Sequence, residues 1–60
     1  MIVKVTRRES ETMNTYTVEY DSGKCKRYYH QTKAIIDFIF DKQPTITKCS
    51  NGTVRIYVWE

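Results

Sequence analysis

The residues best suited to metal binding or nucleophilic catalysis are Cys25, His30 and Cys49. A structural zinc site takes four such ligands, usually in closely spaced pairs, and these three are dispersed along the chain. A nucleophilic pair of Cys25 and His30 would lie on opposite faces of a continuing strand, without a third group to orient it. We therefore expect no enzyme, no metal and no cofactor. Both Cys side chains are expected to pack as small apolar groups, with a disulfide between them as the minor alternative.

Cations and aromatic rings form a second set of residues that could bind a ligand. Ten Lys and Arg against seven Asp and Glu give a formal charge of +3, and five of the aromatic residues are Tyr. Cations neutralise phosphates, and flat rings stack on unpaired bases. A balance this mildly basic permits nucleic-acid binding but does not require it.

Changes in the hydrophobic period define the elements that must position these residues. Apolar residues at Ile35, Phe38 and Ile39 have helical spacing and predict a helix over residues 33–42. Thr32 is expected to cap this helix and Pro44 to stop it. Alternating patterns and turn residues predict strands over residues 2–8, 14–20, 24–29, 44–49 and 53–59.

This order of elements predicts an α+β fold in one domain, residues 1–60. The economical arrangement is a single antiparallel sheet of four to five strands with one helix packed on one face, in the order β-β-β-α-β-β. No run approaches the ~20 apolar residues of a membrane span, so we expect no membrane contact. The N-terminal residues alternate apolar and polar, unlike a signal peptide, which favours a cytoplasmic location.

Turn geometry predicts which side chains share a face of the sheet. A two-residue turn at Asn51-Gly52 pairs residues 45, 47 and 49 with 58, 56 and 54, and Val54, Ile56 and Val58 then mark the core face. A similar turn at Ser22-Gly23 directs a second group of residues toward the core: Tyr16, Val18, Tyr20, Cys25 and Tyr29. It also brings Arg27 to the core side, where we expect it at the sheet margin.

The face away from the helix then combines cations with aromatic rings. Its members are Lys24, Lys26, Tyr28, Lys48, Arg55, Tyr57 and Trp59. Such a surface could hold phosphates and stack on bases, which makes it the candidate nucleic-acid site. The alternative interpretation is a solvated strand face whose Tyr and Lys serve strand formation and solubility.

The helix is more apolar than packing on one sheet requires. Lys33, Asp37 and Asp41 form a single polar stripe, and Ile36 and Phe40 add a second apolar row. This row is either covered by the N-terminal strand or the polar loop, or it faces another protein. We favour a protein interface, a homodimer included, because a chain this short gains little stability from its own core.

The segment that covers residues 16–42 resembles a known DNA-binding arrangement. Its strand 16–20, the Ser22-Gly23 turn, the basic strand 24–29 and the helix 32–42 look like the strand–strand–helix core of integrase arm-binding and AP2-like DNA-binding domains. That resemblance implies a small sheet lying in the major groove, and the C-terminal hairpin is additional to it. In size the chain is also similar to phage and mobile-element proteins that bind and inhibit host machinery.

Taken together, these features favour a non-enzymatic binding protein that docks on a protein partner, of the phage-inhibitor type. Its expected contact residues are Ile36, Phe40, Tyr57 and Trp59. Nucleic-acid binding through the basic and aromatic face is the alternative. Protein docking is preferred because a charge of +3 is small for a dedicated DNA-binding protein.

Overall fold

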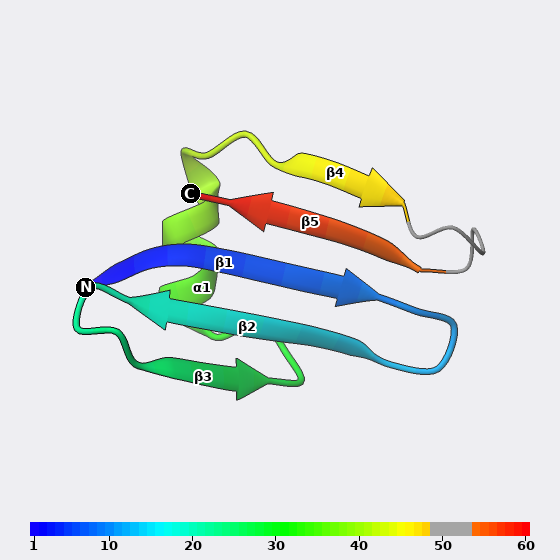
Figure 1. Ribbon diagram of the computed structural model, residues 1–60, viewed down its shortest axis with the longest axis horizontal. Helices are drawn as coiled ribbons and strands as arrows, with labels where there is room; N and C mark the ends of the chain where they lie inside the picture. The colour runs from blue at the N-terminus through cyan, green and yellow to red at the C-terminus, as the bar shows by residue number, and fades with distance from the viewer. Residues whose placement is uncertain (49–53) are drawn as a thin grey trace.

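The fold is one antiparallel sheet of five strands with one helix, as predicted (Figure 1). The computed structural model describes residues 1–48 and 54–60, so Cys49 and the Asn51-Gly52 turn lie outside the described residues. The elements are β1 (Ile2–Glu9), β2 (Asn14–Tyr20), β3 (Cys25–Tyr28), α1 (Lys33–Phe40), β4 (Thr45–Lys48) and β5 (Arg55–Trp59). The α+β fold and the order β-β-β-α-β-β are therefore confirmed.

The helix is the connection between the two edges of the sheet. The strand order is β3-β2-β1-β5-β4, so β3 and β4 are edge strands and α1, which joins them, must cross the sheet. Figure 1 shows α1 behind the sheet and running across the strands. Its eight residues span about 12 Å, whereas five strands span about 19 Å. The helix therefore covers only part of one face.

Two names distinguish the faces of the sheet. The helix-side face carries Val5, Val18 and Trp59. The helix-free face carries Thr6, Thr17 and Val58, each of which is next in sequence to one of those three residues. Within residues 1–48 and 54–60, no helix or strand covers the helix-free face. No helix in that part of the chain has the length and apolar character needed to cross a membrane.

The helix begins where the sequence predicted and ends two residues earlier. The Thr32 hydroxyl oxygen accepts a hydrogen bond from the Ile35 amide at 3.3 Å, which satisfies one of the free donors of the first turn. Ile35 is 1% exposed, and Phe38 and Ile39 pack half-buried beside the core. The core row of the helix is confirmed. The chain leaves the helix at Asp41 because it must still reach the edge position of β4.

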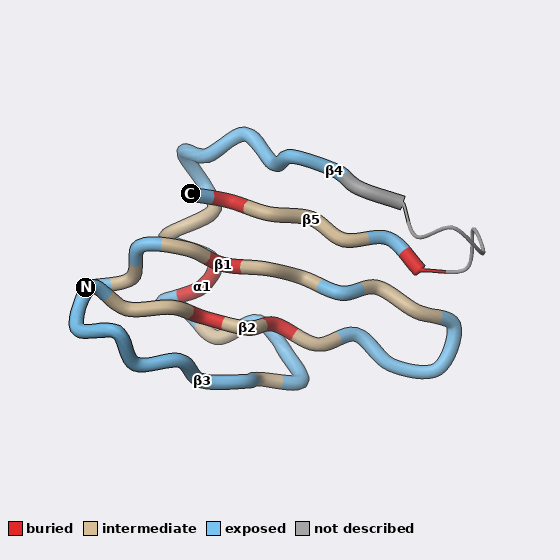
Figure 2. The backbone as a smooth tube through the Cα atoms, viewed as in Figure 1, coloured by how far each residue is buried: buried red, intermediate tan, exposed pale blue. Residues whose placement is uncertain are grey.

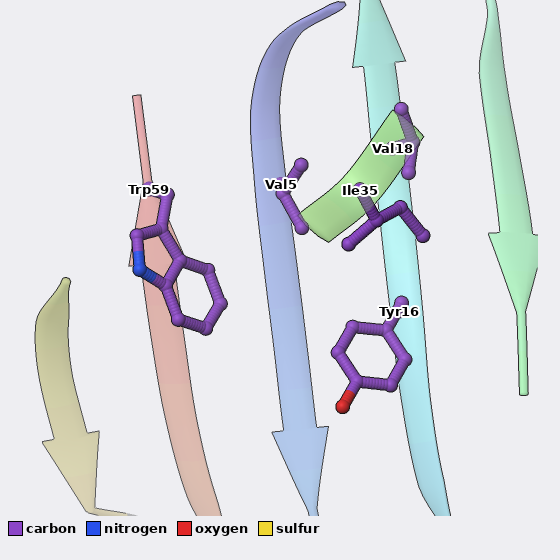
Figure 3. Packing of buried hydrophobic residues seen from close by; sticks show 5 residues of the cluster. All are labelled: Val5, Tyr16, Val18, Ile35 and Trp59. Carbon is purple, nitrogen blue, oxygen red and sulfur yellow. The ribbon is translucent and has the colours of Figure 1, made fainter. Parts of the chain in front are cut away.

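The core is a small cluster at the centre of the sheet. Val5 pairs with Val18 on one side and with Trp59 on the other, and Ile35 lies over this row (Figure 3). Figure 2 shows that buried positions occur on β1, β2, α1 and the C-terminal end of β5, and Val54, a predicted core residue just before β5, is also buried. The ring of Tyr16 extends the cluster, and its hydroxyl accepts a hydrogen bond from Gln31 Nε2 at 3.1 Å.

The predicted facing of β5 is wrong, although its pairing is right. Thr45 pairs with Val58, as the turn geometry predicted. However, Trp59 is only 7% exposed and Tyr57 packs against the core cluster, while Ile56 and Val58 lie half-buried on the helix-free face. A thin helix over a wide sheet leaves space that large rings fill best, because an aromatic side chain buries about 150–250 Å². Val and Ile are well suited to the other face as strand formers.

The predicted facing of β3 is also wrong, because the hairpin loop has three residues instead of two. The Tyr20 amide donates to the Lys24 carbonyl at 2.9 Å, which closes a loop of residues 21–23. Tyr28 therefore pairs with Tyr16 and packs on the core, whereas Cys25 is exposed. A shift of one residue exchanges the two faces of a strand. Two further residues change face with it, Lys26 to the helix side and Arg27 to the helix-free side.

Strand β1 contains a β-bulge that places Ile2 and Val5 on the same face of the sheet. Ile2 pairs with Tyr20 and Lys4 with Glu19, so Val3 is an extra residue between them. Ile2 and Val5 are an odd number of residues apart, and the bulge allows both to pack on the helix side. The same end of the strand is fixed by the N-terminal ammonium group, which lies 3.2 Å from the Asp21 carboxylate.

Two neighbouring isoleucines in α1 test this packing. We expect Ile35→Ala to lower the free energy of unfolding by about 2–4 kcal/mol, because it leaves a cavity beneath the helix. Ile36→Ala is the matched control and should lower it by less than about 1 kcal/mol, because its side chain is 45% exposed. Urea unfolding followed by the fluorescence of Trp59 gives both values. Equal losses would contradict the orientation of α1.

The three-residue loop makes a separate prediction at Gly23. Its φ of +89° is the left-handed conformation, and a Cβ there would meet no atom within 4 Å. We expect Gly23→Ala to destabilise the fold by about 1 kcal/mol through the backbone alone. Gly23→Asn should cost less, because Asn tolerates this conformation. An unchanged urea midpoint in Gly23→Ala would contradict the loop geometry.

Candidate functional site: the two faces of the sheet

The predicted surface of cations and rings lies on the side of the sheet that the helix occupies. Trp59 is buried, and Tyr57 and Tyr28 pack against the core cluster. The pairings of Lys26 with Val18 and of Arg55 with Glu9 place both at the margins of the helix side, where they are exposed. Lys24 is exposed in the hairpin, and Lys48 is placed only by its backbone pairing with Arg55. The rings therefore do not form an exposed platform for stacking bases.

Arg7 occupies the helix-side face, which the sequence analysis missed. Its guanidinium group lies 4.3 Å from the centre of the Tyr57 ring and forms an ion pair with Glu9. Partial burial lowers the pKa of Arg7, but the hydrogen bond from Arg7 to Glu9 and the charges of Glu9 and Tyr16 outweigh it, so the pKa lies above its ordinary value. Its buried Nε has no hydrogen-bond partner among the described residues. Alternation from Val5 was the signal that could have placed Arg7 on this face.

The rings of Tyr57 and Trp59 form a stacked pair on β5, next to Arg7. Their centroids are 6.1 Å apart, with an angle of 18° between the ring planes. Arg7 on the Tyr57 ring thus continues a layered arrangement that begins at the buried indole. The helix-side rings of β5 are therefore occupied by contacts within the chain.

Three of the exposed large apolar side chains lie on α1 and on the strand that follows it. Phe40 is 83% exposed and Ile36 is 45% exposed, and they lie one helical turn apart. Ile46 is 56% exposed and pairs with Tyr57, which places it on the helix-side face at the edge strand β4. We call Ile36, Phe40 and Ile46 the apolar patch. The expected second apolar row of the helix is therefore exposed, and the alternative, a cover by β1 or by the β1–β2 loop, is not seen within residues 1–48 and 54–60.

The helix-free face contains an open concavity of about 510 Å³. Its lining combines β-branched residues of the strands with two arginines and residues of the β1–β2 loop. The lining residues are Thr6, Arg8, Ser10, Thr12, Met13, Thr15, Thr17, Arg27 and Ile56. Arg27, which the sequence analysis placed at the core margin, is thus exposed on this face because of the shifted β3 register.

The charges on the helix-free face are unevenly neutralised. Lys4 lies 3.9 Å from Glu19, and the two are paired across β1 and β2. Arg8 and Arg27 are exposed and make no ion pair with any residue that the structure describes. The concavity therefore carries two positive charges that form no ion pair among residues 1–48 and 54–60.

Among the described residues, the Cys25 thiol and the His30 imidazole are not gathered into a site. The Cys25 thiol is exposed and lies 3.9 Å from a carboxylate oxygen of Glu19, and His30 is exposed in the segment before α1. The described part of the chain holds no cluster of three or more potential metal ligands. The predicted burial of Cys25 is wrong, and the alternative of a Cys25–Cys49 disulfide involves a residue outside the described part.

Comparisons with known proteins add no family to these observations. No protein-family model, no curated protein and no solved structure matches this chain. The strand–strand–helix order that resembles arm-binding domains is present in β2, β3 and α1. Here, however, it is part of a sheet of five strands whose centre is β1.

Adjacent arginines in β1 test the assignment of the two faces. We expect Arg7→Ala to lower the free energy of unfolding by about 1–2 kcal/mol, because it removes the contact with Tyr57 and the partner of Glu9. Arg8→Ala should change it by no more than about 0.5 kcal/mol, because Arg8 is exposed and makes no ion pair with the residues that the structure describes. Urea unfolding of both variants measures the difference. A larger loss in Arg8→Ala would reverse the faces of β1.

Proposed function

We propose that this chain is a non-enzymatic binding protein that docks on a protein partner through the apolar patch. The observation that carries the proposal is the 83% exposure of Phe40 on a short helix. A large ring in water on a folded surface gains stability when a partner covers it. Ile36 and Ile46 extend the contact along the helix and onto β4.

The packing of α1 gives Phe40 no place inside its own chain. Ile35, Phe38 and Ile39 already occupy the row that faces the sheet. Turning Phe40 inward would require rotation of the helix and would expose Ile35. The exposed row is thus a consequence of an eight-residue helix that carries more apolar surface than one contact can bury.

The size of the patch favours a different protein over a second copy of the chain. At roughly 200 Å² for a fully exposed large side chain, the three residues together offer about 350 Å². Two copies meeting through the patch would bury about 700 Å², which is less than the ~1,200 Å² of a stable interface. A partner with an apolar groove can surround Phe40 and bury more, as in the recognition of a helix by a groove.

The other two expected contact residues, Tyr57 and Trp59, lie beside or beneath the apolar patch. Tyr57 is half-buried and pairs with Ile46, so it borders the patch, whereas Trp59 is buried and supports Tyr57 by stacking. An inhibitor of host machinery, of the phage type, would act by occupying such a groove. A cytoplasmic location belongs to the same proposal, because there the exposed Cys25 would remain a free thiol.

Photo-crosslinking from the helix tests the proposal. A benzophenone amino acid in place of Phe40 should crosslink one protein in a lysate of the source organism. With that protein purified, Phe40→Ala should weaken binding by about 10–100-fold, the range expected when a central aromatic contact is removed. Titration by fluorescence anisotropy gives the dissociation constants.

The matched control is Tyr29, which is also aromatic and is 61% exposed, but lies beyond β3 at the other edge of the sheet. Tyr29→Ala should bind the partner as tightly as the unmodified chain. The proposal fails if Phe40→Ala binds unchanged, or if both variants weaken binding equally. If light scattering gives the mass of a dimer for the unmodified chain and of a monomer for Phe40→Ala, the patch binds a second copy of the chain instead.

A further inference from the structure

We infer that the concavity on the helix-free face binds the phosphate backbone of duplex nucleic acid, with Arg8 and Arg27 as its phosphate contacts. This surface is on the opposite side of the sheet from the apolar patch, so the inference does not depend on the proposed function. It also differs from the surface of rings and cations expected from the sequence, most of which lies on the helix side.

The two arginines provide charge that is free to bind an anion. Both are exposed, both line the concavity, and neither makes an ion pair in the described part of the chain. Guanidinium groups bind phosphate oxygens through two parallel hydrogen bonds. Glu19 on this face is already paired with Lys4, and Glu11 in the β1–β2 loop is not among the lining residues.

Hydroxyl groups supply the remaining donors that a phosphate backbone uses. Thr6 and Thr17 are paired across β1 and β2, and Thr15 lies opposite Arg8. None of these three hydroxyls makes a hydrogen bond to another side chain or to the backbone among residues 1–48 and 54–60. Ser and Thr hydroxyls and arginines are common phosphate contacts in protein–DNA interfaces.

The spacing of the arginines suits a chain of phosphates. Arg8 pairs with Thr15 and Arg27 pairs with Thr17, so they are two strands and two residues apart. Strand spacing and residue rise place their Cα atoms about 12 Å apart. Each guanidinium group can then contact a different phosphate of a backbone that lies across β1, β2 and β3.

The shape and composition of the face favour a duplex over a small anion or a single strand. The concavity is open to solvent, whereas a small ligand is held where most of its surface is buried. The described strands direct no aromatic ring to this face, because Tyr16, Tyr28, Tyr57 and Trp59 all lie on the helix side. Tyr29 is 61% exposed but follows the end of β3. The strands of this face therefore offer no ring for stacking on unpaired bases, and we expect recognition through the backbone.

The test is a salt titration with matched charge variants. Binding of a fluorescent duplex of about 20 base pairs is followed by anisotropy from about 20 mM salt upward, and two phosphate contacts predict a log–log slope of about 1.8. Arg8→Gln with Arg27→Gln should weaken binding at low salt at least tenfold. The control, Lys33→Gln with Lys42→Gln, removes the same charge from α1 and from the segment that follows it, and should bind within twofold of the unmodified chain.

Any of four results would overturn the inference. The first is no binding of the duplex at the lowest salt, and the second is equal weakening by the two double variants, which would indicate a general effect of net charge. The third is tighter binding of a single strand of the same length, and the fourth is displacement of the duplex by millimolar inorganic phosphate at constant ionic strength. Because all four residues are exposed, unchanged urea midpoints confirm that each variant is folded.

Discussion

The structure depends on one contact, between the inward row of α1 and the central strands of the sheet. Ile35 lies over Val5 and Val18, and all three are almost completely buried. Because the helix joins the two edge strands, this contact also fixes the path of the chain between β3 and β4. Few other residues are buried, so the fold has little apolar area in reserve. The large rings of Tyr16 and Trp59 fill the space that a longer helix would otherwise occupy.

The elements and their order could be predicted from the sequence because each carries a local signal. The helical spacing of Ile35, Phe38 and Ile39, the cap at Thr32 and the pairing of β4 with β5 all depend on residues close together in the chain. The face of the sheet that a side chain occupies is a different kind of property. It is decided by which side chains best fill a gap formed by distant elements, and nothing in the β4–β5 hairpin itself indicates that the helix packs on the side of Trp59.

The candidate sites in the structure differ from the predicted ones for the same reason. One additional loop residue before Lys24 exchanged the two faces of β3, which buried part of Tyr28 and exposed Arg27. The set of rings and cations was predicted as a group, and the pairings kept most of it on one side, but that side is the one with the helix. The apolar row of the helix survived because its exposure follows from helical geometry alone.

Because of the bulge in β1, the strand holds one extra residue without any change in which face its other side chains occupy. In a regular strand, gaining or losing one residue turns every subsequent side chain to the opposite face. Here the unpaired Val3 absorbs that change, since Ile2 and Val5 reach the same side despite their odd spacing. The beginning of the chain is therefore a place where related sequences could differ by one residue while the inside and outside of the sheet remain the same.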